Sequence, residues 1–468
     1  MSVRRLSPED ELMLRLDDLW PQDIGAIGIL DGTALLDPDD ALRIDALREA
    51  IGARLERAPR FRQLICSPGR FRGGPVWVDA PAVDLRHHVR VHALPKGSDE
   101  GQLLGAVETL RSRRLDPSRP QWEMWFLPGL AENRVGLFIR WQHAIADGRA
   151  AVSLLAAFLD PGPDAARPAA AAWTPAPWPT SAALVLDLLG HRARGLSTMA
   201  GHLLRPRATL TTIRDAVPML RETLAQEPGP ETSLNRLVGP GRRFAVLRAT
   251  LPEVEQLAAA HGATVNDVLL AMTAGGLRAL LSARGEPVEG VRIPVYVPVS
   301  LRPRAGGTSE GNLISQMVVP LPLGAGDPSG RLRRIAGSTV RRKTVTRPSL
   351  GTVFRSRTIG RVMLRAVNRQ RVNVETGKVR GPAAPVYLAG AHLLEIFPVL
   401  NLVGRVGLGV GALSYDGALE ICVTADRDGC PDLDVFVDGA RRELALLAAA
   451  AGTTSAPRAA GSTHPPEP

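Results

Sequence analysis

The chain has 468 residues, of which 45% are apolar, 22% are charged and 4% are aromatic. This composition supports a globular protein and excludes both a disordered chain and a bundle of membrane-spanning helices. At about 150 residues per domain, the length allows three units or two large ones. The formal net charge is +10, so the distribution of the basic residues bears on what the protein binds.

The first part of the chain, residues 1–160, alternates strand-like and helix-like segments. Residues 45–63 are predicted to form a helix and residues 134–142 a strand, because their apolar residues follow helical spacing and alternation, respectively. Residues 161–181 are rich in Ala and Pro and resemble a linker. Leu- and Arg-rich helical segments follow, so we expect a crossover linker over residues 161–235.

A second mixed unit is predicted over residues 236–450. Residues 291–300 and 418–426 are typical of strands, and residues 440–451 are typical of a closing helix. The tail, residues 451–468, is predicted to be disordered. The sequence therefore indicates an α/β (α+β) protein of two similar halves, with any ligand held in the cleft between them.

Positive charge is concentrated in residues 331–380, which contain fifteen Lys and Arg and one acid. Within this window four arginines recur every four residues, opposite an apolar face: Arg357, Arg361, Arg365 and Arg369. Three interpretations of this basic amphipathic helix compete: a solvated surface helix, a helix lying on anionic lipid, and a nucleic-acid patch. The last is disfavoured, because Phe354 is the one aromatic residue in the window and no known nucleic-acid motif accompanies it.

Cysteine usage and the N-terminal segment indicate the compartment. The three widely spaced cysteines build neither a disulfide framework nor a four-thiolate zinc site, which favours a reducing compartment. Acids interrupt the N-terminal segment, so no secretory signal is expected. The longest charge-free stretch, residues 168–186, contains four prolines and is not a spanning helix. We expect a cytoplasmic protein.

Metal and nucleotide cofactors are not predicted. The adjacent histidines His87 and His88 point to opposite faces if they lie on a strand, and no further ligand cluster accompanies them. Neither a dinucleotide-binding glycine fingerprint nor a GxxxxGK[ST] phosphate loop occurs.

The segment from residue 134 to residue 160 carries the chemistry, because it is predicted to be a strand, a short loop and a helix. Alternation puts five residues on one face of the strand: Val135, Leu137, Ile139, Trp141 and His143. A histidine at a strand end suits a general base, because an unperturbed pKa of about 6.5 leaves it mostly neutral at pH 7. Asp147, followed by Gly148, then opens the helix as an acidic N-cap. The alternative is that His143 is a core histidine and Asp147 only a cap.

The octapeptide WQHAIADG, residues 141–148, resembles the HHxxxDG signature of the chloramphenicol-acetyltransferase-like superfamily. Condensation domains and the wax ester synthase/diacylglycerol acyltransferase family share this signature. Other segments are similar to the latter family: LSPEDELMLRLDD, PVWVDAPAVDLRHHVRVHALP, LDPSRPQWEMWFLPGL, GATVNDVLLAMTAGGLRALL, VPVSLRP and GALSYDGALEICVTAD. These blocks cover most of residues 5–450 in the family's order.

The resemblance implies two chloramphenicol-acetyltransferase-like domains that meet at a central channel. It implies acyl-CoA as a substrate, no bound cofactor, and a long-chain alcohol or diacylglycerol as the acceptor, for wax ester or triacylglycerol synthesis. By the same resemblance, His143 removes the hydroxyl proton and the alcohol attacks the thioester directly, without a covalent acyl-enzyme. The lipid acceptors imply a peripheral location at an anionic membrane or lipid-droplet surface, and no nucleic-acid partner.

The resemblance also assigns supporting residues. Asp147 is expected to anchor the catalytic loop, with Arg302 of VPVSLRP as its predicted partner, and Gly148 completes the motif. Asn266 and Asp267 of the Asn-Asp block are expected to support the site from the second half. Asp267 also stands three residues after Thr264, which is the spacing of a capping box, so a helix cap alone would explain it.

Ser414, Tyr415 and Gly417 are expected to line the channel, with a turn between two strands as the alternative. The sequence departs from the family pattern at two positions. Gln142 replaces the first histidine of the signature, and Lys378 replaces the usual asparagine of an SNVxGP-like stretch. Both changes leave open a non-catalytic or re-purposed lipid-surface relative, and a condensation-type enzyme that uses carrier-bound acyl groups is the second enzymatic alternative.

Overall fold

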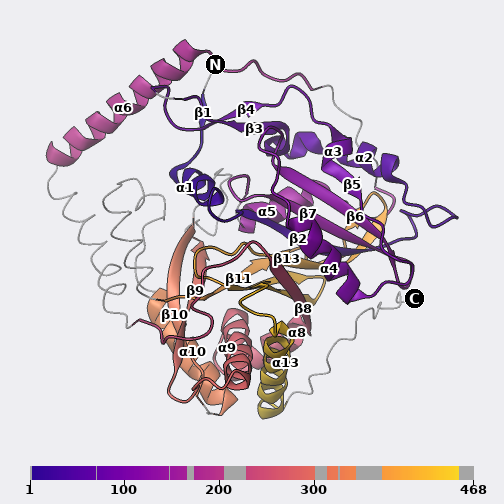
Figure 1. The fold of residues 1–468 in the computed structure, drawn as a ribbon, viewed down its shortest axis with the longest axis vertical. Helices are drawn as coiled ribbons and strands as arrows, with labels where there is room; N and C mark the ends of the chain where they lie inside the picture. Colours follow the sequence, from indigo (N-terminus) through magenta and orange to yellow (C-terminus); the bar gives the residue numbers. More distant parts are fainter. Residues whose placement is uncertain are drawn as a thin grey trace.

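Two six-stranded sheets form the framework of the chain (Figure 1). The structure is a computed structural model that describes residues 3–69, 71–146, 148–165, 173–204, 228–300, 314–324, 327–343 and 371–452. Helices cover the sheets, so the layers are those of an α/β protein.

The first sheet has the strand order β12-β13-β2-β7-β6-β5. Its strands are β2 (Asp23–Asp31), β5 (Val89–Val91), β6 (Trp122–Leu130), β7 (Arg134–Gln142), β12 (Tyr387–Leu388) and β13 (Ala391–Val399). The predicted strand at residues 134–142 is confirmed as β7. A small sheet of β1 (Arg4–Arg5), β4 (Val76–Asp79) and β3 (Gln63–Cys66) lies beside it in the same half. The central position of β7, between β2 and β6, fixes the strand that leads to His143.

The helices of the first half are α1 (Pro8–Asp17), α2 (Ile44–Gly52), α3 (Leu85–His88), α4 (Glu100–Arg111) and α5 (Gly148–Ala156). The helix predicted over residues 45–63 is too long, because α2 ends at Gly52 and two 3-10 turns follow, Leu55–Arg57 and Pro59–Arg62. Pro59 begins the second turn, and a proline cannot continue an α-helix because it lacks the N–H and fixes its backbone.

The pair His87 and His88 ends the short helix α3, so the assignment of this pair to a strand is wrong. The two rings lie 5.1 Å apart in an edge-on arrangement. Burial lowers the pKa of His88 to about 4, while its Nδ1 lies 2.8 Å from the carbonyl oxygen of Trp122. His88 is therefore a neutral core histidine.

The second sheet has the order β10-β9-β11-β14-β15-β8. Its strands are β8 (Arg242–Thr250), β9 (Arg292–Ser300), β10 (Ile314–Pro322), β11 (Val374–Arg380), β14 (Leu408–Tyr415) and β15 (Ala418–Asp426). Among the described residues, four helices accompany it: α8 (Leu251–Ala260), α9 (Val265–Ala283), α10 (Pro328–Lys343) and α13 (Leu433–Ala450). The predicted strands at 291–300 and 418–426 and the closing helix are confirmed, and that helix starts earlier than predicted, at Leu433.

Helices α9 and α13 pack closely because glycines face each other at their contact. A Cβ atom on Gly276 would lie 2.7 Å from the Phe436 ring, and one on Gly439 would lie 2.8 Å from the carbonyl oxygen of Gly275. The helices bury the apolar face of the second sheet, which forms the largest core cluster.

The second half contributes two strands, called here the exchanged strands, to the first sheet. Strands β12 and β13 follow β11 in the sequence, yet β13 pairs antiparallel with β2 of the first sheet, from Leu393 opposite Leu30 to Val399 opposite Gly25. The chain then returns to the second sheet as β14. No local sequence pattern indicated this exchange, which makes the first sheet depend on residues of the second half.

Helix α6 (Ser181–Leu204) runs along the outside of the first half (Figure 1). Leu184 packs on Val76 and Val78, and the Asp187 carboxylate lies 2.5 Å from the Arg5 guanidinium. The expected basic helix with Arg357, Arg361, Arg365 and Arg369 lies outside the described residues, as do residues 166–172, 205–227 and 453–468. Within the described ranges, no helix has the length and apolarity needed to cross a membrane.

Candidate active site

Strand β7 delivers His143 to the end of the first sheet. Val135, Leu137, Ile139 and Trp141 all belong to one apolar cluster, as the predicted alternation requires, whereas Phe138 belongs to a different one. The strand ends at Gln142, and His143 starts the loop to α5. From Val135 to Ala146 every residue is buried except His143, which is partly exposed. His143 is therefore the one residue of this segment that is accessible from outside the core.

Three hydrogen bonds hold the loop after β7. The backbone N–H of His143 donates to the carbonyl oxygen of Gln22 (2.7 Å), and the N–H of Ile145 donates to the carbonyl oxygen of Gln142 (2.9 Å). The Gln142 Oε1 atom accepts from the N–H of Ala144 (2.5 Å). Gln142, which is 2% exposed, thus shapes the turn that carries His143.

Two predicted members of the catalytic loop, Asp147 and Arg302, lie outside the described residues. Their expected ion pair stays a prediction. Gly148 is the first residue of α5, as the helix start predicted from the motif requires.

Asp267 is the N3 residue of a capping box on α9, as predicted. Its Oδ2 accepts from the N–H (2.9 Å) and the hydroxyl (2.7 Å) of Thr264, and its own N–H donates to Thr264 Oγ1. Its Oδ1 accepts from the Thr339 hydroxyl of α10 at 2.7 Å. The buried carboxylate therefore joins two helices. Asn266, next to it, lies partly buried in the first turn of α9.

Lys378 lies on β11, opposite Ala412 of β14. Burial lowers the pKa of Lys378, the positive charge of Arg380 lowers it further, and the negative charge of Glu255 partly offsets both effects. Helix α5, which follows the His143 loop, packs against β11. The structure thus brings the strand that carries Lys378 next to the helix of the catalytic motif.

Ser414, Tyr415 and Gly417 lie at the hairpin between β14 and β15. Asp416 (φ 42°) and Gly417 (φ 70°) form the two-residue turn, which favours the turn alternative for Gly417. The Tyr415 hydroxyl donates to the carbonyl oxygen of Leu393 (2.6 Å) and accepts from the N–H of Val386 (3.1 Å). Burial raises the pKa of Tyr415 to about 12. Tyr415 therefore joins β14 to the exchanged strands.

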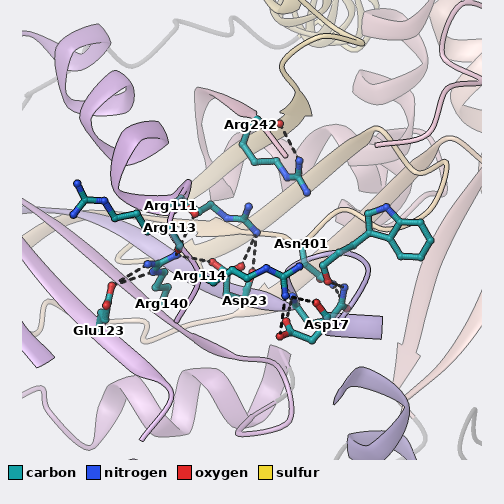
Figure 2. Close-up of polar contacts among 12 residues, drawn as sticks. Asp17, Asp23, Arg111, Arg113, Arg114, Glu123, Arg140, Arg242 and Asn401 are labelled. Atoms are coloured by element: carbon teal, nitrogen blue, oxygen red, sulfur yellow. Dashed lines mark hydrogen bonds and ion pairs between the residues drawn. The ribbon is translucent and has the colours of Figure 1, made fainter. Parts of the chain in front are cut away.

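A buried network of charged residues surrounds Arg140 of β7, three positions before His143, and sequence reasoning missed it (Figure 2). The Arg140 guanidinium of β7 lies 2.9 Å from the Glu123 carboxylate and 3.4 Å from that of Asp23. It also donates to the carbonyl oxygens of Arg111 (3.2 Å) and Arg113 (2.7 Å). The available signal was a charged residue within an otherwise apolar strand.

Arg242, at the start of β8, extends this network toward the second half (Figure 2). Its guanidinium donates to the carbonyl oxygens of Gly239 (2.6 Å) and Gly241 (2.9 Å) and lies 3.9 Å from the Asp426 carboxylate. Burial and, to a smaller extent, the positive charge of Arg111 lower the pKa of Arg242 to about 10. Two buried guanidinium groups, one at the end of α4 and one at the start of β8, therefore lie within electrostatic reach of each other.

Comparison with known proteins gives two matches to family models. The model described as the wax ester synthase/diacylglycerol acyltransferase catalytic domain matches residues 6–269. The model described as the WS/DGAT C-terminal domain matches residues 310–448. Together the two matched ranges include strands of both six-stranded sheets.

Curated relatives match nearly the whole chain. A Mycobacterium bovis protein named as a diacylglycerol O-acyltransferase is 28% identical over 453 residues, which are 91% of this chain and 91% of that protein. A Mycobacterium tuberculosis protein named in the same way is 29% identical over 483 residues, covering 97% and 99%.

Solved structures agree with these relatives. The wax ester synthase/diacylglycerol acyltransferase from Marinobacter aquaeolei VT8 is 26% identical, with a TM-score of 0.67 over 96% of this chain and 100% of that one. The first condensation domain of the CDA synthetase is 16% identical, with a TM-score of 0.58 over 97% and 98%, and shows the fold alone. The predicted pair of chloramphenicol-acetyltransferase-like α/β domains is confirmed, and the central channel stays a prediction.

Proposed function

The chain belongs to the wax ester synthase/diacylglycerol acyltransferase family, and from this premise we propose that His143 is the general base of its reaction. The chain is an acyl-CoA-dependent O-acyltransferase of wax ester and triacylglycerol synthesis. Acyl-CoA is the donor substrate, and a long-chain alcohol or a diacylglycerol is the acceptor class.

The proposed reaction needs one base. A ring nitrogen of His143 accepts the proton of the acceptor hydroxyl as its oxygen forms a bond to the thioester carbonyl carbon. The tetrahedral intermediate then breaks the carbon–sulfur bond, and the departing CoA thiolate takes the proton from the imidazolium. The thioester already has a good leaving group, so no covalent acyl-enzyme is required.

One observation carries the proposal: His143 is the only residue from Val135 to Ala146 that is not buried. The ring therefore extends from a fixed element, because β7 is hydrogen-bonded on both sides and the His143 N–H is anchored to Gln22. A base held by a rigid strand end meets the geometric demand of proton transfer better than one on a free loop.

We assign supporting tasks to the other predicted residues. Gln142 holds the loop through the hydrogen bond that its side chain accepts from the Ala144 N–H. Asp147, next to Gly148, is proposed to pair with Arg302 and so to complete the loop; both charged residues lie outside the described residues.

From the second half, we assign site support to Asn266 and Asp267 at the start of α9 and channel lining to Ser414 and Lys378. We assign Tyr415 and Gly417 an indirect role, Tyr415 through its bonds to Leu393 and Val386 and Gly417 through the turn between β14 and β15.

The test is an assay of the purified protein with labelled acyl-CoA and either hexadecanol or diacylglycerol. His143→Ala is expected to lower ester formation by about 10²- to 10⁴-fold, the usual contribution of a general base. His92→Ala, which removes an imidazole beyond β5 at the far edge of the same sheet, is expected to keep wild-type activity.

Full activity of His143→Ala would overturn the assignment. No ester from the wild-type protein would favour the non-catalytic alternative, and ester only from carrier-bound acyl groups would favour the condensation-type one.

We also propose that the enzyme works at a lipid surface, which it contacts through the outer face of α6. Leu186 and Leu189 are 69% and 54% exposed on this helix, and Trp178, just before it, is 50% exposed. Exposed apolar side chains gathered on one peripheral helix are typical of an interfacial element. The lipid acceptor and product require access to such a surface.

Sedimentation with anionic phospholipid vesicles tests this contact. Leu186→Ser/Leu189→Ser is expected to weaken binding severalfold, whereas Leu446→Ser, which changes an exposed leucine of α13, is expected to leave it unchanged. Neutralising Arg357, Arg361, Arg365 and Arg369 is expected to remove the salt-dependent part of the binding. Equal binding by all these variants would contradict the proposal.

A further inference from the structure

The catalytic loop is anchored by a residue from another element. The His143 N–H donates to the carbonyl oxygen of Gln22, which lies just before β2 and has no exposed surface. Gln22 is itself fixed: its N–H donates to Asp17 Oδ1 (2.5 Å) and its Nε2 donates to the carbonyl oxygen of Trp20 (2.8 Å). These bonds orient the Gln22 amide so that Oε1 remains as an acceptor.

That acceptor is bound by the second half of the chain. The Asn401 Nδ2 donates to Gln22 Oε1 at 2.7 Å, across 379 positions of sequence, and Figure 2 shows Asn401 beside Asp17. The contact joins the strap between β13 and β14, residues 400–407, to the segment that holds His143. A change at residue 401 therefore reaches the catalytic loop through two hydrogen bonds.

The position of Asn401 is set by packing of the strap on the second sheet. Leu402 is fully buried, and Leu400 lies over two glycines of β14. A Cβ atom at Gly409 or Gly411 would lie 3.3 Å or 3.2 Å from Leu400 atoms. The two glycines therefore leave the space that the Leu400 side chain fills. Asn401 lies between these two leucines, and their packing therefore holds it within hydrogen-bond distance of Gln22.

We propose that Asn401 is a positioning residue for the acyl transfer, which acts by fixing Gln22 and through it the His143 backbone. The inference rests on the proposed role of His143. General-base catalysis needs the ring nitrogen within hydrogen-bond distance of the hydroxyl, and small displacements of a catalytic group lower the rate steeply. The second half thus sets the position of a base that the first half carries.

Two variants test the inference, Asn401→Ala and the isosteric Asn401→Asp, which keeps the size but lacks the amide donor. Both are expected to form hexadecyl ester about tenfold more slowly, the value of one such hydrogen bond, with the KM for acyl-CoA unchanged. An alcohol fluorinated next to the hydroxyl carbon is more acidic and needs less help from a base. The defect is therefore expected to shrink with this acceptor, whereas a smaller folded fraction would slow both acceptors equally.

The matched control is Gln63→Ala. Gln63 Nε2 donates to the Asp79 carboxylate (3.0 Å) between β3 and β4 of the small sheet, and so makes no contact with the strap. Its variant is expected to show the wild-type ratio of the two acceptor rates. Gln22→Ala is expected to reproduce the Asn401→Ala defect. The double variant is expected to be no worse than either single one, because both substitutions break the same hydrogen bond between Asn401 and Gln22.

Equal defects with both acceptors, additive effects in the double variant, or loss of folding in both Asn401 variants would overturn the inference. None of these results touches the role of His143. Full activity of His143→Ala would instead overturn the proposed function, whatever Asn401 does, so the two failures are distinguishable.

Discussion

Two of the contacts between the halves of the molecule are built differently. We call the contact of α4 with β8 the α4–β8 seam and the contact of α5 with β11 the α5–β11 seam. Both join a helix of the first half to a strand of the second half. They differ in how their polar groups are paired.

The α4–β8 seam is closed by charge pairs and apolar packing. β8 is an edge strand, and the N–H of Phe244 donates to Glu108 of α4 at 3.2 Å. The Arg248 guanidinium pairs with Glu395 (2.7 Å) and with Glu100 of α4 (2.5 Å). Side chains from α4, β8 and β13 share one buried apolar cluster. A carboxylate that pairs with an edge strand also blocks that edge to other chains.

The α5–β11 seam contains partly buried ionisable groups and the helix that follows the His143 loop. Burial raises the pKa of Glu375 to about 7 and lowers that of Lys378, and both residues lie on β11. The partly exposed His143 precedes α5. The α4–β8 seam is therefore held by paired charges, whereas the α5–β11 seam contains ionisable groups whose pKa values are shifted by burial.

The largest stability effect is expected at Arg140, in the buried network of the first half. Arg140→Ala removes the nearest charge partner of the buried Glu123 carboxylate (2.9 Å) and leaves Asp23 with Arg111 (3.3 Å) as its remaining arginine. The free energy of unfolding is expected to fall by about 3–5 kcal/mol, measured by denaturant titration. Arg441→Ala removes an exposed pair with Asp438 and is expected to cost less than about 1 kcal/mol. Equal costs for the two variants would show that the buried network contributes no more to stability than an exposed ion pair.

A smaller, pH-dependent effect is expected at Glu375 on the α5–β11 seam. Because its pKa in the folded protein, about 7, exceeds its ordinary value, the protonated form stabilises the fold. That stability is present below the ordinary value and is lost as the pH rises through about 7. We expect the free energy of unfolding to fall by about 1–3 kcal/mol between pH 4.5 and pH 8.

Glu375→Gln is expected to abolish this decline, whereas Glu49→Gln, at an exposed position, is expected to retain it. Denaturant titrations across that pH range measure both. An unchanged slope in Glu375→Gln would assign the decline to another group.

The smallest effect is expected at Glu108. Glu108→Ala removes the acceptor of the Phe244 N–H and the partner of Arg427, and is expected to cost about 1 kcal/mol with kcat unchanged. Glu108→Gln keeps an acceptor oxygen and is expected to lose less. A fall in kcat without a loss of stability would show that the α4–β8 seam takes part in the chemistry. The two seams would then not differ in this respect.

Features with a local pattern could be predicted from the sequence. Alternation predicted β7, and the spacing of Thr264 and Asp267 predicted the capping box of α9. The helix predicted over residues 45–63 was too long because its apolar spacing continues past Gly52, where α2 ends and two 3-10 turns begin to follow. Local periodicity therefore sets the type of an element better than its end.

Long-range pairings could not be predicted. The exchange of β13 into the first sheet, the contact of Asn401 with Gln22 and the pairing of Arg140 with Asp23 join positions more than a hundred residues apart. Such contacts depend on the tertiary fold, and a single sequence contains no spacing that specifies them. The residues that position His143 are for this reason the part of the site that only the structure supplies.

The most direct test of the central claim is chemical rescue of His143→Gly. Ester formation from labelled acyl-CoA and hexadecanol is measured with and without added imidazole. If the His143 ring is the base, the variant is inactive alone and regains ester formation in proportion to the imidazole added, because the glycine leaves space for the free base. Wild-type ester formation by His143→Gly without imidazole would contradict the account.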